Sequence, residues 1–236
     1  MFKKKKLLLQ ISPRSLVTRD NTQSIVSEQY RTIRTNINFS MPDKDLKTIL
    51  ITSATSGEGK STSAANIAIV FAQEGKKVLL VDGDMRRPTM HYTFRTTNTA
   101  GLSNLLTRQW NVDDVVKQTG VEGLNLITCG QIPPNPAELL GSKSMDLLIK
   151  ELKLKYDVIV FDAPPVLSIA DAQILANKCD GTILVVNSGV TDKESAKKAK
   201  EVLQASKANI IGTLLNNFKL EKSHYYSENY YPVSKV

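Results

Sequence analysis

The stretch Ala54-Thr55-Ser56-Gly57-Glu58-Gly59-Lys60-Ser61-Thr62 decides the fold, because it has the form of a loop that wraps around a chain of phosphates. The run before it, 48–52, is short, apolar and β-branched, as a buried parallel strand should be. The run after it, 63–73, carries alanine with isoleucine, valine and phenylalanine at helical spacing. Strand, glycine loop and helix are the context that a phosphate-binding loop requires. The sequence therefore predicts a nucleotide site on an α/β core.

Each residue type in this phosphate loop (54–62) has a physical reason to be there. Gly57 and Gly59 permit backbone torsions and a close approach that a Cβ would prevent. Successive N–H groups and the N-terminus of the following helix then point at the phosphates. Lys60 supplies charge to the β- and γ-phosphates, and the Ser61 hydroxyl is placed to hold Mg²⁺. The residues expected to bind ATP are Ser56, Gly57, Glu58, Gly59, Lys60, Ser61 and Thr62, while Ala54 replaces the usual leading glycine.

Two further strands deliver aspartates to the same place. The apolar strand 77–82 ends in Asp82, and Asp84 follows two positions later. Strands of open α/β sheets present ligand-binding residues at their C-terminal edge, so both carboxylates should emerge beside the phosphate loop. One of them can orient Mg²⁺ while the other accepts a proton from an attacking hydroxyl. The apolar strand 157–161 precedes Asp162, which is expected to hold magnesium from the far side of the site.

The rest of the chain alternates between runs of strand and helix length. Strands are predicted at 48–52, 77–82, 124–128, 157–161, 182–187 and 209–215, and helices at 27–39, 60–73, 142–154, 170–177 and 193–205. Short apolar strands separated by helices imply a mostly parallel sheet with helices on both faces. The proline-rich segment 132–136 is interpreted as a rigid connector. The predicted fold class is α/β, of the P-loop NTPase type.

Composition sets limits on the class of protein. A chain of 236 residues that is 41% hydrophobic suits one substantial domain, and no apolar run approaches the ~18–20 residues that span a bilayer. Residues 1–19 hold six basic residues and no acid, so the net charge of +8 comes mainly from an N-terminal arm. The remaining chain is nearly neutral and has no basic stripe, so nucleic acid is not an expected partner. Cys129 and Cys179 lack metal-type spacing, which indicates a reducing cytoplasm.

This pattern divides the chain into a flexible basic arm (1–24), a P-loop domain (25–220) and a flexible tail (221–236). The arm either touches an acidic membrane surface or a partner, or is a solvated lead-in. The tail carries Tyr225, Tyr226, Tyr230 and Tyr231 among Ser, Asn and Glu, without apolar periodicity. Because a core does not use tyrosine in this way, the tail is either a substrate or an aromatic surface that packs on a neighbour.

The chain resembles the bacterial tyrosine kinases of capsule and exopolysaccharide assembly (BY-kinases), in particular the Gram-positive form with a separate cytoplasmic kinase chain. The likeness covers nearly everything from about Ile25 to the C-terminus. It is carried by Glu28-x-x-Arg31-x-x-Arg34, the phosphate loop, Val81-Asp82-Gly83-Asp84-Met85-Arg86, Ile132-Pro133-Pro134-Asn135-Pro136-Ala137-Glu138-Leu139, Phe161-Asp162-Ala163-Pro164-Pro165, Asp171-Ala172-Gln173 and the terminal tyrosines. Such kinases are similar in fold to the partition and cell-division ATPases.

The resemblance implies roles for individual residues. Lys60, Asp82 and Asp84 would carry the chemistry, with either aspartate activating a tyrosine hydroxyl. ATP would be accompanied by Mg²⁺ held by Ser61, Asp82 and Asp162. The tail tyrosines would be autophosphorylated, one subunit's tail entering its neighbour's site, and other proteins would also be substrates.

The resemblance also implies partners. Glu28, Arg31 and Arg34 share one helical face, and in this family that face forms the contact between subunits of a ring. Phosphorylated tails would loosen the ring by charge repulsion. A membrane protein would activate the kinase through its cytoplasmic end and recruit it to the inner face of the plasma membrane, and a cognate tyrosine phosphatase would reverse the reaction.

Two other classes share these motifs. A partition-type ATPase usually carries an extra lysine near the start of the phosphate loop, where this chain has Thr55, and usually ends in a basic or amphipathic element rather than in tyrosines. A regulator that kept the fold but lost catalysis would not need Lys60 and its aspartates. Both comparisons favour the kinase.

Overall fold

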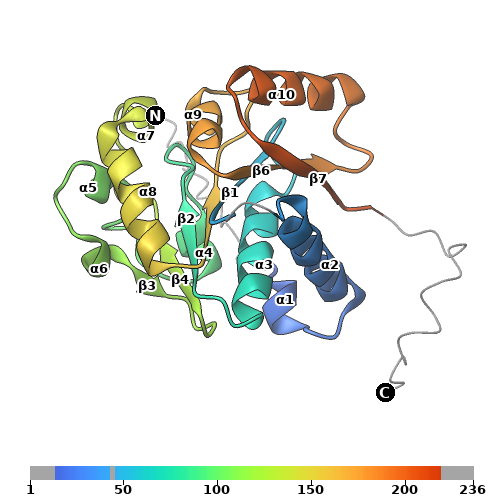
Figure 1. Ribbon diagram of the computed structural model, residues 1–236, viewed down its shortest axis with the longest axis horizontal. Coiled ribbons are helices and arrows are strands. Elements are labelled where there is room, and N and C mark those ends of the chain that lie inside the picture. Colours follow the sequence, from blue (N-terminus) through green and yellow to red (C-terminus); the bar gives the residue numbers. More distant parts are fainter. Residues whose placement is uncertain (1–13, 43–45, 219–236) are drawn as a thin grey trace, which may run out of the picture.

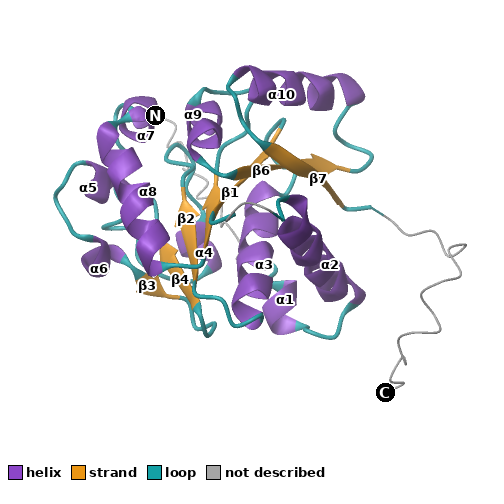
Figure 2. Ribbon diagram, viewed as in Figure 1, coloured by secondary structure: helices purple, strands orange, loops and turns teal. Residues whose placement is uncertain are grey.

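The computed structural model describes residues 14–42 and 46–218, which form a seven-stranded sheet in the order β3-β4-β2-β5-β1-β6-β7. The strands make a central layer with helices on both sides (Figure 2). The strands are β1 (Thr48–Ser53), β2 (Val78–Asp82), β3 (Lys117–Gln118), β4 (Leu124–Ile127), β5 (Val158–Asp162), β6 (Gly181–Asn187) and β7 (Ile210–Asn216). The helices are α1 (Val17–Asp20), α2 (Ile25–Ser40), α3 (Lys60–Gln73), α4 (Met90–Thr93), α5 (Leu102–Leu106), α6 (Val112–Val115), α7 (Pro136–Gly141), α8 (Lys143–Lys155), α9 (Asp171–Lys178) and α10 (Lys193–Ala205).

The sheet is parallel except for the short antiparallel pair β3 and β4. Strands β1, β2 and β5 are buried along their whole length, which explains why their sequences are continuous apolar runs rather than alternating ones. The predicted α/β class with a mostly parallel sheet and helices on both faces is confirmed.

Successive side chains of each central strand enter opposite cores, because the side-chain period of a strand is two. In β1, Ile49 and Ile51 pack with α1 to α4, whereas Leu50 packs with the helices from α5 onward. The first group of helices, with α3 at its centre, therefore covers one face of the sheet, and α5 to α10 cover the other (Figure 1).

The register brings the predicted site residues to one edge. Ile51 of β1 pairs with Asp162 of β5, and Asp82 of β2 pairs with Asp162 from the other side. Strand β1 ends at Ser53, and the phosphate loop begins at the next residue and leads directly into α3. Three adjacent parallel strands thus end at the same place, as the strand motifs predicted.

The differences from the sequence prediction concern short elements. Five helices of four to six residues (α1, α4, α5, α6 and α7) and the two-residue strand β3 were not predicted, because they are too short to display a period. The proline-rich segment is a connector only in part, since Pro136 is the first residue of α7, a position that suits its missing N–H.

The N-terminal boundary predicted at residue 25 is too late, because the described residues 14–24 already pack against the domain. Leu16 is completely buried among the residues around α3. The Thr18 N–H and hydroxyl donate to Asn66 Oδ1 at 3.0 and 2.8 Å, and Gln73 Nε2 donates to the Thr18 carbonyl at 2.7 Å. Segment 14–24 is therefore part of the domain, and the rest of the predicted arm lies outside the described residues.

Truncating Leu16 should test this assignment. Leu16→Ala removes a fully buried side chain and leaves a cavity, so we expect the free energy of unfolding to fall by about 2–5 kcal/mol. Urea denaturation monitored by circular dichroism measures this loss. The matched control is Leu154→Ala, whose side chain is 89% exposed and should change stability by less than about 0.5 kcal/mol. Equal effects of the two substitutions would contradict the packing of this segment.

Candidate functional site

The phosphate loop connects β1 to α3 through two glycines with positive φ. Gly57 has a φ of +87° and Gly59 a φ of +94°, a region that other residues rarely adopt. A Cβ on Gly59 would also clash with the Asn216 side-chain amide, at the end of β7. Gly57, Gly59 and Lys60 line a cavity of about 540 Å³, and so do Ser56, Ser61 and Thr62. The structure thus brings six of the seven predicted ATP-binding residues around one cavity.

The seventh, Glu58, does not face this cavity. Its side chain is 1% exposed and accepts hydrogen bonds from the Ala54 N–H (2.8 Å) and the Thr55 hydroxyl (2.9 Å). The Thr191 hydroxyl, beyond β6, donates to the same carboxylate at 2.8 Å, and Asn216 Nδ2 donates to the Glu58 carbonyl at 3.0 Å. The Glu58 side chain therefore fixes the shape of the loop and ties it to the segment after β6, while the Glu58 carbonyl ties the loop to the end of β7.

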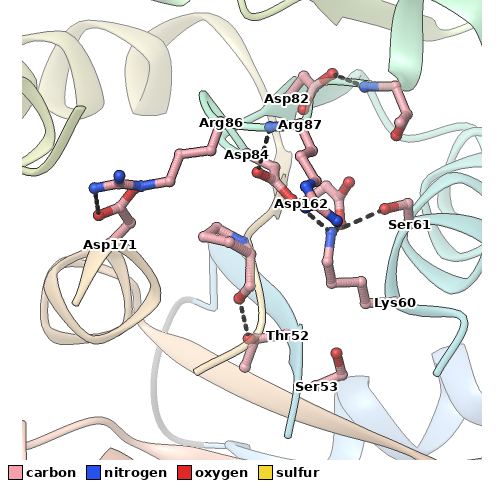
Figure 3. Close-up of polar contacts among 12 residues, drawn as sticks. Thr52, Ser53, Lys60, Ser61, Asp82, Asp84, Arg86, Arg87, Asp162 and Asp171 are labelled. Atoms are coloured by element: carbon pink, nitrogen blue, oxygen red, sulfur yellow. Dashed lines mark hydrogen bonds and ion pairs between the residues drawn. The ribbon is translucent and has the colours of Figure 1, made fainter. Parts of the chain in front are cut away.

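Lys60 lies between two aspartates at the C-terminal edge of the sheet (Figure 3). Its ammonium is 3.1 Å from Asp84 Oδ2 and 3.5 Å from Asp162 Oδ1, and it donates to the Ser61 hydroxyl at 3.1 Å. Burial lowers the pKa of Lys60, but attraction to Asp162 and Asp84 outweighs it, so the pKa is raised and the side chain stays charged. The phosphate loop thus contacts the aspartates that follow both strands, as the sequence predicted.

Asp82 and Asp84 occupy different environments although they stand two residues apart. Asp84 lines the cavity, contacts Lys60, and accepts the Arg87 N–H at 3.0 Å. Asp82 is fully buried, and its Oδ2 accepts the N–H groups of Thr89 and Met90 at the start of α4 (3.0 and 2.9 Å). Burial and the nearby Asp162 raise the pKa of Asp82 to about 7. Asp84 therefore has access to the cavity, whereas Asp82 has a pKa suited to proton transfer near neutrality.

The residues at the bottom of the site fit a magnesium ion. Asp82 Oδ1 and Asp162 Oδ2 are buried and without a hydrogen-bond partner, which is costly unless a ligand satisfies them. Burial raises the pKa of Asp162, against the opposing influence of Lys60 and Ser61. In the described part of the chain no group of three or more His, Cys, Asp or Glu forms a metal site by itself. That is compatible with Mg²⁺, which usually takes one or two carboxylates together with phosphate and water oxygens.

Two features of the site were not predicted. Arg86, which lines the cavity, pairs with Asp171, which is fully buried at the start of α9, with Nε–Oδ2 and Nη2–Oδ1 distances of 2.9 and 3.2 Å (Figure 3). Both residues stood in recognised motifs, but nothing in their spacing indicates the pair. Arg14, which the sequence assigned to the arm, lines the cavity, and its Nη1 donates to the hydroxyls of Thr89 (2.6 Å) and Thr93 (3.2 Å).

The three residues predicted at a subunit contact lie on α2 and have partners within the chain. Arg31 pairs with Glu28 and donates to the Thr22 carbonyl at 2.8 Å. Arg34 turns toward α3, where Nη1 donates to the Val70 carbonyl at 2.9 Å. The Glu28 and Arg31 side chains remain about one-third exposed, so they stay accessible on this helix. The tail tyrosines Tyr225, Tyr226, Tyr230 and Tyr231 lie outside the described residues.

The raised pKa of Asp82 should make stability depend on pH. As pH rises from about 4 to about 7, the unfolded chain ionises this carboxyl freely, whereas the fold resists, so its contribution to stability is lost over that interval. Asp82→Asn stays neutral and can still accept both N–H bonds. Without nucleotide or magnesium, its melting temperature should therefore rise relative to wild type across this range, by about 10 °C in all, since a pKa raised from 3.8 to about 7 corresponds to about 4 kcal/mol and about 1 kcal/mol corresponds to about 2–4 °C in a chain of this size.

The control for this measurement is Asp113→Asn, whose side chain is 85% exposed. Its melting temperature should run parallel to that of wild type from pH 4 to 8. A constant offset for Asp82→Asn over the same range would show that Asp82 ionises normally in the folded chain.

Comparisons with known proteins agree with this geometry. A family model described as an AAA domain matches residues 46–214, which span the sheet and the phosphate loop. The septum site-determining protein MinD of Pyrococcus horikoshii, solved with Mg-ADP, is similar in structure with a TM-score of 0.63 and 26% identity, over 75% of this chain and 72% of that one. The fold is therefore that of the P-loop NTPases related to cell-division ATPases.

Closer similarity is found among kinases. The solved structure of the chimerical protein CapA2B2 has a TM-score of 0.84 and 40% identity, over 89% of this chain and 93% of that one. Tyrosine-protein kinase YwqD of Bacillus subtilis is 50% identical over 213 residues, which cover 90% of each chain. This degree of identity over almost the whole length shows that the chain belongs to the family of bacterial tyrosine-protein kinases.

Proposed function

We propose that this chain transfers the terminal phosphoryl group of ATP to tyrosines, first of all to Tyr225, Tyr226, Tyr230 and Tyr231 of its own tail, in the regulation of capsule or exopolysaccharide synthesis. The observation that carries the proposal is the contact of Lys60 with Asp84 and Asp162 beside an open phosphate loop. This arrangement provides a charge for the phosphates and carboxylates for the proton. Family membership supplies tyrosine as the acceptor.

Each group has a role in this reaction. The loop amides and Lys60 hold the phosphates, and either Asp82 or Asp84 accepts the proton of the tyrosine hydroxyl. Mg²⁺, when bound, neutralises charge on the phosphates, and the residues that would hold it are Ser61, Asp162 and Asp82. The two unpartnered carboxylate oxygens at this position support that assignment.

We further propose that the tail is phosphorylated in trans within a ring. Strand β7 ends at Asn216, which contacts the phosphate loop, so the chain leaves the described fold beside the nucleotide site. Tyr225 follows Phe218 by seven residues, a reach of roughly 25 Å at about 3.3–3.6 Å per residue, so length alone permits both cis and trans transfer. Glu28 and Arg31 on α2, each about one-third exposed, are with Arg34 the proposed contact between subunits.

The same proposal includes partners outside the chain. No helix in the part of the protein that the structure describes is long and apolar enough to cross a bilayer. We propose that a membrane protein activates the kinase through its cytoplasmic end and holds it at the inner face of the plasma membrane, and that a tyrosine phosphatase removes the phosphates. A partition-type ATPase activity, the alternative that the sequence motifs left open, is not favoured by the comparisons; it would predict ATP hydrolysis with an unmodified tail.

The proposed activity predicts phosphate on the tail. After co-expression with its membrane activator and incubation with Mg-ATP, peptide mass spectrometry should find phosphotyrosine among the four tail tyrosines. Lys60→Met removes the charge between Asp84 and Asp162 and should abolish the modification, whereas the exposed Lys198→Met on α10 should leave it unchanged. ATP hydrolysis with an unmodified wild-type tail would instead support the partition-type ATPase.

Transfer in trans has its own test. Lys60→Met with an intact tail is mixed with an active chain in which all four tail tyrosines are phenylalanine. Phosphate should then appear on the tail of the Lys60→Met chain, because the active subunit supplies the site. If that tail stays unmodified under conditions where wild type modifies itself, transfer occurs within one chain.

A further inference from the structure

The cavity beside the phosphate loop is lined by four basic side chains, which differ in what they bind. Lys60 forms ion pairs with Asp84 and Asp162, and Arg86 forms an ion pair with Asp171. Arg14 and Arg87 form no ion pair with a carboxylate among the residues that the structure describes. Arg87 is exposed to solvent, whereas Arg14 is partly buried and held in place. Arg14 is therefore a fixed positive charge with no anionic partner, in a cavity built for phosphates.

Two hydroxyls position the Arg14 guanidinium. Its Nη1 donates to Thr89 Oγ1 at 2.6 Å and to Thr93 Oγ1 at 3.2 Å, and these recorded bonds use one of its three nitrogens. Thr93 is 4% exposed, so this anchor is buried. Hydroxyl acceptors orient a guanidinium without neutralising it, and the remaining N–H groups can bind a phosphoryl group in the forked geometry that arginine favours.

The segment that carries Arg14 and the element that carries its threonine partners are both fixed to the nucleotide site. Asn66 Nδ2 donates both to the Ser15 carbonyl (3.2 Å) and to the Thr62 carbonyl (2.9 Å), which ties the segment to the first turn of α3. On the other side, the N–H of Thr89 is bound by Asp82 Oδ2. Arg14 thus bridges the helix that follows the phosphate loop and the element that follows the Asp82 strand.

This position corresponds to the terminal end of the phosphate chain. The loop amides hold the α- and β-phosphates, and the loop lysine reaches the β- and γ-phosphates. Because Lys60 points at Asp84 and Asp162, the terminal phosphoryl group belongs on the aspartate side, where Arg14 is anchored. Burial raises the pKa of Asp162, and the charge of Arg14 opposes that rise slightly, which shows that its field reaches the aspartate side of the cavity.

We propose that Arg14 binds the terminal phosphoryl group of ATP and stabilises its charge during transfer, acting from within the same chain. The inference rests on the proposed function in taking ATP as the phosphoryl donor. In the reaction the bond between the γ-phosphorus and the β,γ-bridging oxygen breaks, and its electron pair leaves with ADP. A bond forms from the tyrosine Oη to phosphorus, and the tyrosine proton passes to Asp82 or Asp84. Arg14 donates hydrogen bonds to the non-bridging oxygens throughout.

The test compares nucleotides with and without the terminal group. Arg14→Gln keeps a polar side chain but removes the charge, so the Kd for the non-hydrolysable analogue AMP-PNP should rise about 10- to 100-fold, as for a lost charged hydrogen bond. The Kd for ADP should change by less than about twofold. The kcat for ATP should fall by roughly 10²- to 10³-fold, the range seen when one donor to a developing charge is removed. Arg14→Lys, which retains charge but not the fork, should recover part of both losses.

The matched control is Arg19→Gln, five residues further along the same segment, where the side chain is exposed and pairs with Asp20. It should bind both nucleotides like wild type. Equal weakening of ADP and AMP-PNP by Arg14→Gln would show that Arg14 only anchors the segment, and wild-type affinities would show that it does not touch the phosphates. Either result overturns the proposal.

A second variant covers the case in which Arg14→Gln folds poorly. Thr93→Val keeps the arginine but removes one of its two hydroxyl anchors, and the same loss of AMP-PNP selectivity is expected.

The readouts separate this proposal from the proposed function. ATP hydrolysis and AMP-PNP binding need no tyrosine acceptor. If Arg14→Gln loses AMP-PNP selectivity while the wild-type tail is never phosphorylated, the role of Arg14 stands and the kinase proposal fails. If the tail is phosphorylated equally by wild type and Arg14→Gln, the kinase proposal stands and the role of Arg14 fails.

Discussion

The contact of the Lys60 ammonium with Asp84 and Asp162 is the interaction on which the rest of the site depends. It joins the start of α3 to the ends of β2 and β5, and so brings three separate segments of sequence to one point. A single buried charge left without its partners would be strongly destabilising. The sheet order, with β5 between β1 and β2, is what allows one lysine to contact both aspartates.

The second determinant is the short helix α4 and its backbone contact with Asp82. A fully buried carboxylate binds two N–H groups of this helix with one oxygen and leaves the other unpartnered. The free oxygen is available to a cation, while the bonded oxygen fixes the position of Thr89. Asp82 therefore serves the structure and the chemistry at the same time, which explains how a carboxylate with a pKa raised to about 7 is retained in the core.

The sequence predicted the large elements well, and the reason is periodicity. Helices α3 and α10 begin and end at the predicted residues, and the six predicted strands lie within one or two residues of their positions. The convergence of the phosphate loop, Asp84 and Asp162 followed from the rule that parallel strands end at one edge. Arg14 was beyond this reasoning, because no recognisable motif surrounds it in the sequence and its threonine partners are 75 and 79 residues away. The inward direction of Glu58, between two glycines, likewise depends on Thr191 and cannot be inferred from local pattern.

The crowding between Gly59 and Asn216 has a consequence for how this chain can change over generations. The amide of Asn216 occupies the space that any side chain at position 59 would need, and it also binds the carbonyl of Glu58. A larger residue at 59 would expel Asn216 and disturb the point where the chain departs toward its tyrosines. Position 59, which already requires glycine for its φ of +94°, is therefore constrained a second time by a residue 157 positions later, at the point where the chain leaves the described fold.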